Sequence, residues 1–135
     1  MTSVPTKARP FRAKRLALLV LIALMLVTAA TGRLQYRRSI AAAKESVLKT
    51  DLSRMREAIH QYFERKGRYP SSLDSLVAEG YLRRIPADPF TRSSVTWTTT
   101  RVGRDPSKPS AEPGVHDVRS GARGTARDGS RYSDW

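Results

Sequence analysis

The hydrophobic pattern divides the first half of the chain into two stretches of different character. Residues 16–31 (LALLVLIALMLVTAAT) form an apolar run without a single charged side chain. From Ser39 to Phe63, apolar residues instead recur every three or four positions, the spacing of an amphipathic helix. Because no linker follows Gly32, the sequence predicts an apolar helix that continues directly into an amphipathic stalk.

The amphipathic stretch carries one apolar stripe along its length. We expect the helix to end at Gly67, and Pro70 marks the chain as non-helical by then. The stripe consists of Val47, Leu48, Leu52, Met55, Ile59, Tyr62 and Phe63.

The apolar run has three interpretations: a membrane helix, a cleaved signal peptide or a buried core helix. Sixteen residues span about 24 Å as a helix, and continuing to Tyr36, with Arg33 snorkelling, reaches membrane length. A signal peptide would share the basic start and the small residues at 28–30. The sequence stays helical beyond Ala30, however, which favours an uncleaved transmembrane helix over residues 16–36.

The chain has a net charge of +13 over 135 residues, and the excess flanks the apolar run. Residues 1–15 carry +5, residues 33–69 carry +6 and residues 70–135 only +2. Basic residues in these positions fix membrane topology and contact anionic headgroups, so we expect residues 1–15 to be cytoplasmic. This distribution weighs against a nucleic-acid-binding protein.

Shorter elements follow the stalk. Ser71 or Ser72 is expected to cap a short helix that Gly80 ends. Residues 85–90 (IPADPF) are expected to be a rigid connector, because each proline disfavours helix at the residue before it.

The last third of the chain predicts a small β structure. Residues 94–102 (SVTWTTTRV) form the best strand, residues 103–114 a loop and residues 115–118 a second short strand. The tail ends in Tyr132 and Trp135, so we expect it to fold back on the domain.

The predicted organisation therefore has four parts: residues 1–15, the membrane helix 16–36, the stalk helix 37–66 and a small head 67–135. The fold class is α+β, with a long helix packed on a small antiparallel sheet. We expect the head to pack on the helix through Leu52, Met55, Ile59, Tyr62, Tyr69, Leu76, Trp97 and Trp135.

Four short motifs, in this order after the two helical stretches, resemble the type II secretion pseudopilins, and most of all their major, G-type member. The resemblance covers residues 16–135. The motifs are Gly-Arg-Tyr-Pro at 67–70, Gly-Tyr-Leu at 80–82, Pro-Ala-Asp-Pro-Phe at 86–90 and Asp-Val-Arg-Ser-Gly at 117–121.

The resemblance implies a type IV pilin-like fold and a structural role in protein export. Its partners would be other pseudopilin subunits, an inner-membrane assembly platform with its ATPase, and lipid. The subunit would be a single-pass protein of the bacterial inner membrane with a periplasmic head, and it would have no small-molecule substrate. Filament or membrane-helix residues would include Leu16, Leu19, Leu26 and Tyr36.

Two features depart from that family. Its processing site has a glycine and a glutamate where this chain has Arg12 and Ala17. The resemblance also implies a calcium ion in the C-terminal loop, but Arg123 stands where the family has an aspartate. The candidate oxygen ligands are Asp128, Asp134, Asp117, Ser120 and Ser130, of which Asp128 and Asp134 are preferred.

The sequence does not favour an enzyme. The residue types of a catalytic triad are present as Ser120, His116 and Asp117, but the sequence around them has no nucleophile elbow. A monomeric, membrane-anchored binding protein is the main alternative, and it would contact DNA phosphates through the C-terminal arginines. These arginines are Arg119, Arg123, Arg127 and Arg131.

Overall fold

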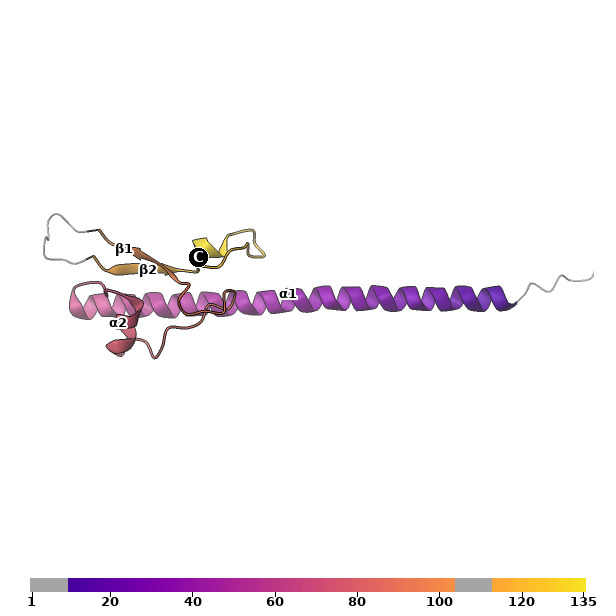
Figure 1. Ribbon diagram of the computed structural model, residues 1–135, viewed down its shortest axis with the longest axis horizontal. Coiled ribbons are helices and arrows are strands. Elements are labelled where there is room, and N and C mark those ends of the chain that lie inside the picture. The colour runs from indigo at the N-terminus through magenta and orange to yellow at the C-terminus, as the bar shows by residue number, and fades with distance from the viewer. Residues whose placement is uncertain (1–9, 104–112) are drawn as a thin grey trace, which may run out of the picture. The chain divides into compact units, whose positions relative to one another are not determined.

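The computed structural model describes residues 10–103 and 113–135 (Figure 1). The chain divides into two compact units, residues 1–40 and residues 41–135. The elements are α1 (Pro10–Lys66), α2 (Leu73–Ala78), β1 (Thr98–Arg101), β2 (Val115–Arg119) and a short 3₁₀ helix, η1 (Tyr132–Asp134). The α+β layout predicted from the sequence is confirmed, with one long helix and a two-stranded antiparallel sheet.

Helix α1 begins earlier than the apolar run. Its first residue is Pro10, and proline suits the first turn because it has a helical φ and no amide hydrogen to leave unpaired. Arg12 and Arg15 are therefore helical. The remainder of the predicted segment 1–15, residues 1–9, lies outside the described residues.

In the first unit the apolar side chains of α1 are exposed along its whole described length. Its few polar groups in the apolar run bond back to the helix: the Thr28 hydroxyl donates to the Leu24 carbonyl at 3.0 Å, and Thr31 to Val27 at 3.0 Å. Such internal bonds leave the hydroxyls independent of water.

The second unit has a hydrophobic core against residues 48–62 of α1. Figure 1 shows β1 and β2 lying along this part of the helix. Tyr69 and Trp135 are partly buried and pack against the core. Its buried residues include Leu48, Leu52, Met55, Ile59, Tyr62, Leu73, Leu76, Trp97, Val115, Val118 and Tyr132.

Two members of the predicted stripe lie outside this core. Val47 is 49% exposed and Phe63 is 39% exposed, because the head covers a narrower face of the helix than the full stripe. Phe63 instead stacks on Tyr69 with ring centroids 4.4 Å apart.

The short helix and both glycine stops are confirmed. The Ser72 hydroxyl accepts the Ser75 amide at 3.3 Å and caps α2. Gly67 and Gly80 follow their helices with φ of +66° and +82°, a conformation that side-chain-bearing residues disfavour.

The first strand is shorter than predicted. Only Thr98–Arg101 pair with β2, in a register that sets Thr98 opposite Arg119. The preceding residues serve other contacts: Ser93 bridges to Asp88, and the Trp97 indole donates to the Pro86 carbonyl at 2.8 Å. The second strand matches its prediction with one added residue, and residues 104–112 of the predicted loop lie outside the described residues.

Candidate functional site

The first candidate site is the exposed apolar surface of α1 in the first unit. An 18-residue stretch of this helix is strongly apolar, and none of it is buried. Leu16, Leu19, Leu26 and Tyr36 are 65–69% exposed. Residues 10–103 and 113–135 therefore contain one helix, near the N-terminus, that is long and apolar enough to cross a membrane.

The second candidate site is the C-terminal loop, which residues of α1 hold directly. Glu45 Oε1 accepts the Arg127 amide at 3.0 Å and the Tyr132 hydroxyl at 3.2 Å. One turn along α1, Lys49 Nζ lies 4.3 Å from the centre of the Trp135 ring, within cation–π range. The predicted folding back of the tail is confirmed by these contacts and by the burial of Tyr132.

Within the loop, Ser130 joins an acidic residue to the terminal tryptophan. Asp128 Oδ1 accepts the Ser130 amide at 2.9 Å and its hydroxyl at 2.6 Å, and these bonds lower the pKa of Asp128. The Trp135 indole in turn donates to Ser130 Oγ at 2.7 Å. The loop is thus closed by direct protein contacts.

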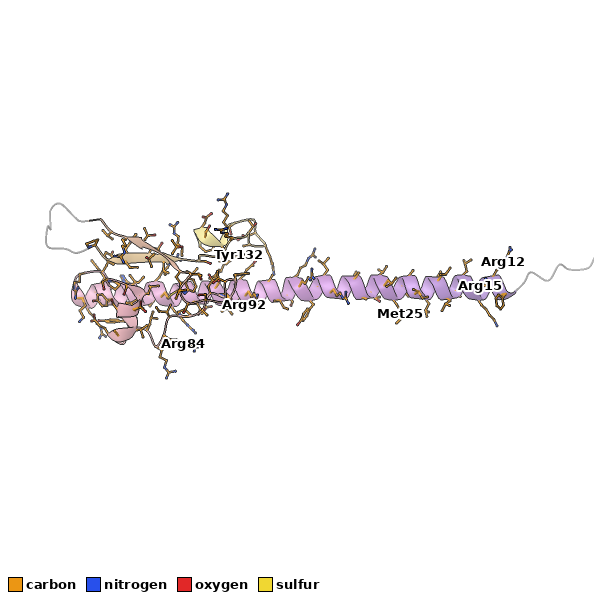
Figure 2. The ribbon with its side chains drawn as sticks, in the orientation of Figure 1. Arg12, Arg15, Met25, Arg84, Arg92 and Tyr132 are labelled. Carbon is orange, nitrogen blue, oxygen red and sulfur yellow. The ribbon has the colours of Figure 1, made fainter. Side chains whose placement is uncertain are left out.

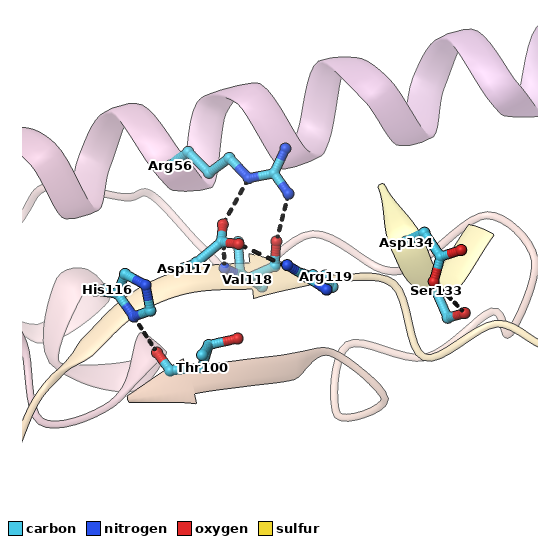
Figure 3. Close-up of polar contacts among 8 residues, drawn as sticks. All are labelled: Arg56, Thr100, His116, Asp117, Val118, Arg119, Ser133 and Asp134. Carbon is cyan, nitrogen blue, oxygen red and sulfur yellow. Dashed lines mark hydrogen bonds and ion pairs between the residues drawn. The ribbon is translucent and has the colours of Figure 1, made fainter. Parts of the chain in front are cut away.

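Asp117 faces helix α1 rather than the loop (Figure 3). It accepts from Arg56 Nε at 2.8 Å, and Arg119 Nε lies 3.5 Å from its second oxygen. Burial raises the pKa of Asp117, but the bonds from Arg56 and the Val118 amide outweigh burial and leave this pKa below its usual value. Arg56 also donates to the Val118 carbonyl at 3.0 Å, which ties β2 to the helix.

Ser120 belongs to a buried network that the sequence did not reveal. It donates to Asp88 Oδ2 at 2.5 Å and accepts the Ala122 amide at 3.0 Å. Asp88 is fully buried, and its other oxygen accepts the amides of Phe90 and Thr91. Interpreting residues 85–90 as a connector was therefore incomplete, since Asp88 organises both its own turn and the segment after β2.

Tight packing fixes the same region. A Cβ added at Gly121 would lie 1.9 Å from the Thr96 carbonyl oxygen, so the two backbones meet where only glycine fits. The available signals in the sequence were Asp88, which a proline follows, and Ser120, two positions before Ala122, whose amide its hydroxyl accepts. Their pairing across 32 residues has no local signature.

The five residues proposed as calcium ligands do not share one arrangement. Asp128 and Ser130 are bonded to each other, whereas Asp117 is engaged by Arg56 and Ser120 by Asp88. Asp134 accepts only a 3.4 Å bond from its neighbour Ser133 among the described residues. Across residues 10–103 and 113–135, no group of three or more acidic, His or Cys side chains is placed to hold an ion. The donors as arranged do not fit a calcium centre, and calcium binding stays a prediction.

The structure also shows the contacts of the residues considered for a catalytic triad and for DNA binding. His116 Nδ1 lies 3.0 Å from the Thr100 carbonyl, and the Ser120 hydroxyl is directed to Asp88. The four C-terminal arginines are exposed, but Tyr132 is buried against Phe90, with ring centroids 4.0 Å apart. Of the two aromatic side chains in this loop, Trp135, which is partly buried, is therefore the one that a nucleic-acid base could stack on.

Comparison of the chain with models of protein families, with characterised proteins and with solved structures found no match.

Proposed function

We propose that this protein is a membrane-anchored structural subunit of the pseudopilin type, which assembles through its apolar helix and carries a small head outside the inner membrane. The observation that carries the proposal is the contrast along α1. Its apolar residues are exposed over positions 16–36, whereas residues 48–62 support the core of a head. An apolar surface of this extent is stable in lipid or against other apolar helices.

The motifs at 67–70, 80–82, 86–90 and 117–121 support the pseudopilin type. They contribute local structure to the head: Gly67 and Gly80 end helices, Asp88 organises a buried turn, and Ser120 and Gly121 seal it. The basic residues ahead of position 16 support a cytoplasmic N-terminus and, with it, a periplasmic head.

Cysteine crosslinking in membranes tests the assembly. The chain has no cysteine, so single substitutions at exposed helix positions report on one site each. Leu19→Cys and Leu26→Cys, treated with an oxidant, are expected to give dimers, and the double variant is expected to give ladders of higher multiples. Val95→Cys, at a side chain that is 87% exposed on the head, is the matched control.

Membrane extraction separates the two parts of the proposal. Resistance to alkaline carbonate with ladders supports an assembling anchored subunit. Resistance without crosslinked products indicates the monomeric anchored protein, and release into the carbonate wash contradicts the anchor itself.

A further inference from the structure

A groove on the second unit carries three arginines at its rim. It has a volume of about 800 Å³ and lies between α1 and the segment that follows α2. Leu82, Pro86 and Ala87 give it an apolar lining over the buried Met55, and the largely buried Asp51 also borders it. Arg54, Arg83 and Arg84 lie around them.

The positive charge of this rim is poorly balanced within the protein. Arg54 is the best compensated, yet its guanidinium is 4.0 Å from Asp51 and its side chain is 73% exposed. Among the described residues, no carboxylate lies within 4 Å of Arg83 or Arg84. Figure 2 shows Arg84 extending away from the ribbon. Three neighbouring guanidinium groups with one carboxylate attract an anionic partner.

The backbone that presents Arg83 and Arg84 is fixed on both sides. The amides of Tyr81 and Leu82 both donate to the Leu76 carbonyl, at 2.8 and 3.0 Å. On the other side, the Pro86 carbonyl accepts the Trp97 indole at 2.8 Å. The backbone that carries the two arginines is therefore fixed before any partner arrives, which lowers the ordering cost of binding to that of the side chains.

The lining selects the class of partner. Guanidinium groups bind carboxylates and phosphates alike, but the groove has no aromatic ring on which a nucleic-acid base would stack. Its apolar surface suits aliphatic side chains. We propose that this groove binds an acidic segment of another protein, with carboxylates on the three arginines and an apolar side chain over Leu82 and Pro86.

This inference rests on the head alone and does not depend on the membrane or filament role. A second copy of the chain is disfavoured as the occupant of this groove, because residues 41–135, with 17 basic and 12 acidic side chains, carry a net charge of +5. The partner is therefore expected to be an acidic protein of different sequence.

Fluorescence anisotropy tests the proposal with the full chain in nanodiscs of zwitterionic lipid. The probe is a labelled peptide of alternating glutamate and leucine, and the same peptide with glutamine in place of glutamate is its control. The groove variant is Arg54→Gln, Arg83→Gln and Arg84→Gln. Its matched control, with an equal loss of charge on other exposed arginines, is Arg65→Gln, Arg68→Gln and Arg123→Gln.

We expect the groove variant to bind the acidic peptide about tenfold more weakly, since each exposed charge pair contributes modestly and three act together. The control variant should change the affinity by less than about twofold. Equal losses in both variants, or no binding by the native protein, would overturn the proposal. So would tighter, groove-dependent binding of an oligonucleotide or of anionic lipid vesicles of equal charge.

Thermal melting of each variant checks the fold. If the triple variant melts early, the pair Arg83→Gln and Arg84→Gln decides, because both side chains are exposed and outside the core. A pair variant that retains full affinity for the acidic peptide would contradict the assignment.

Discussion

Leucines of α1 have opposite environments in the two units. Leu19, in the first, is 65% exposed, and Leu52, in the second, is 1% exposed. The first stretch is apolar on all sides of the helix, so nothing in its own sequence selects a face to bury. The second has one stripe, and the head covers most of it. Whether a leucine is buried is thus decided by what surrounds the helix in the first unit and by the protein's own fold in the second.

Polar contacts differ in the same way. In residues 10–40, the described side-chain hydrogen bonds run back to carbonyls three or four residues earlier, as for Thr28 and Thr31. In residues 41–135 local bonds are joined by bonds between distant parts of the chain, as between Glu45 and Tyr132. The second unit therefore carries its own tertiary contacts, whereas the apolar side chains of the first unit are exposed.

The largest effect is expected from charges placed in the first unit. Leu19→Asp with Leu26→Asp should release the protein from membranes, because an aspartate at the helix centre, as at position 26, costs about 2.5–3.5 kcal/mol of insertion free energy. The aspartate at position 19, nearer the helix end, adds a smaller cost. Carbonate extraction followed by immunoblotting of the pellet measures the loss.

The matched control for those charges is Val95→Asp. Val95 is 87% exposed on the head, so a charge there should leave membrane association and head stability unchanged. Retention of the Leu19 and Leu26 double variant in the carbonate-washed pellet would contradict the membrane assignment.

A large-to-small change in the second unit should act on folding. Leu52→Ala is expected to lower the free energy of unfolding by about 2–5 kcal/mol, because it leaves a cavity in the core. Both tryptophans, Trp97 and Trp135, lie in this unit, so tryptophan fluorescence in urea reports its unfolding alone. Membrane extraction of the variant should stay native.

Val47→Ala sharpens this comparison. Val47 belongs to the stripe predicted from the sequence, yet it is 49% exposed. Its truncation should cost less than about 1 kcal/mol. Equal costs at Val47 and Leu52 would mean that the head covers the whole stripe.

These contrasts also show what the sequence predicted well. The stripe around Leu52, Met55 and Ile59 was predictable because helical periodicity is a local signal. The caps at Ser72 and Gly80 were predictable for the same reason, since each depends on neighbours within four residues.

The sequence predicted poorly wherever a residue serves a distant partner. Asp88 looked like part of a connector because Ser120, which bonds to it, is 32 residues away. The strand predicted at 94–102 begins only at Thr98: the Trp97 indole bonds to Pro86, and Ser93, just before the predicted strand, pairs with Asp88. The candidate calcium ligand Asp117 likewise pairs with Arg56, 61 residues earlier.

The ion pair between Arg56 and Asp117 gives a pH-dependent contribution to the second unit. Arg56→Met should lower the free energy of unfolding at pH 7 by about 1–2 kcal/mol, below the roughly 1.5–3 kcal/mol of a hydrogen bond with a charged group because the Arg56 side chain is 41% exposed. The pKa of Asp117 is lower in the folded chain than in the unfolded chain. The contribution is therefore fully present above the unfolded pKa of about 3.9 and is lost as the pH falls through the lower, folded pKa.

Urea unfolding of both proteins at neutral pH and near pH 3 measures this. The difference between native and variant should shrink on acidification. Arg119→Met is the control, because its guanidinium lies 3.5 Å from Asp117 and makes no bond to Val118 in the described structure. A difference that grows toward low pH would contradict the assignment.

The smallest effect is expected where α1 holds the C-terminal loop. Lys49→Met keeps the aliphatic stem but removes the charge over Trp135, and the cation–π contact is worth about 0.5–1 kcal/mol at an exposed site. That corresponds to a fall of about 2–8 °C in the melting temperature of a domain this size. Lys44→Met, whose ammonium is 5.8 Å from the Phe90 ring, should have a smaller effect.

The response to calcium distinguishes two explanations of what holds the C-terminal loop to α1: direct side-chain contacts or a bound ion. If Lys49, Glu45 and Ser130 close it by direct contacts, adding calcium at about 1 mM, or removing it with a chelator, should leave the melting temperature of the native protein unchanged. A calcium-dependent rise that persists in Lys49→Met and disappears in Asp128→Asn would instead support the ion that the pseudopilin resemblance implies. In that case the cation, rather than the lysine, would hold the tail to its helix.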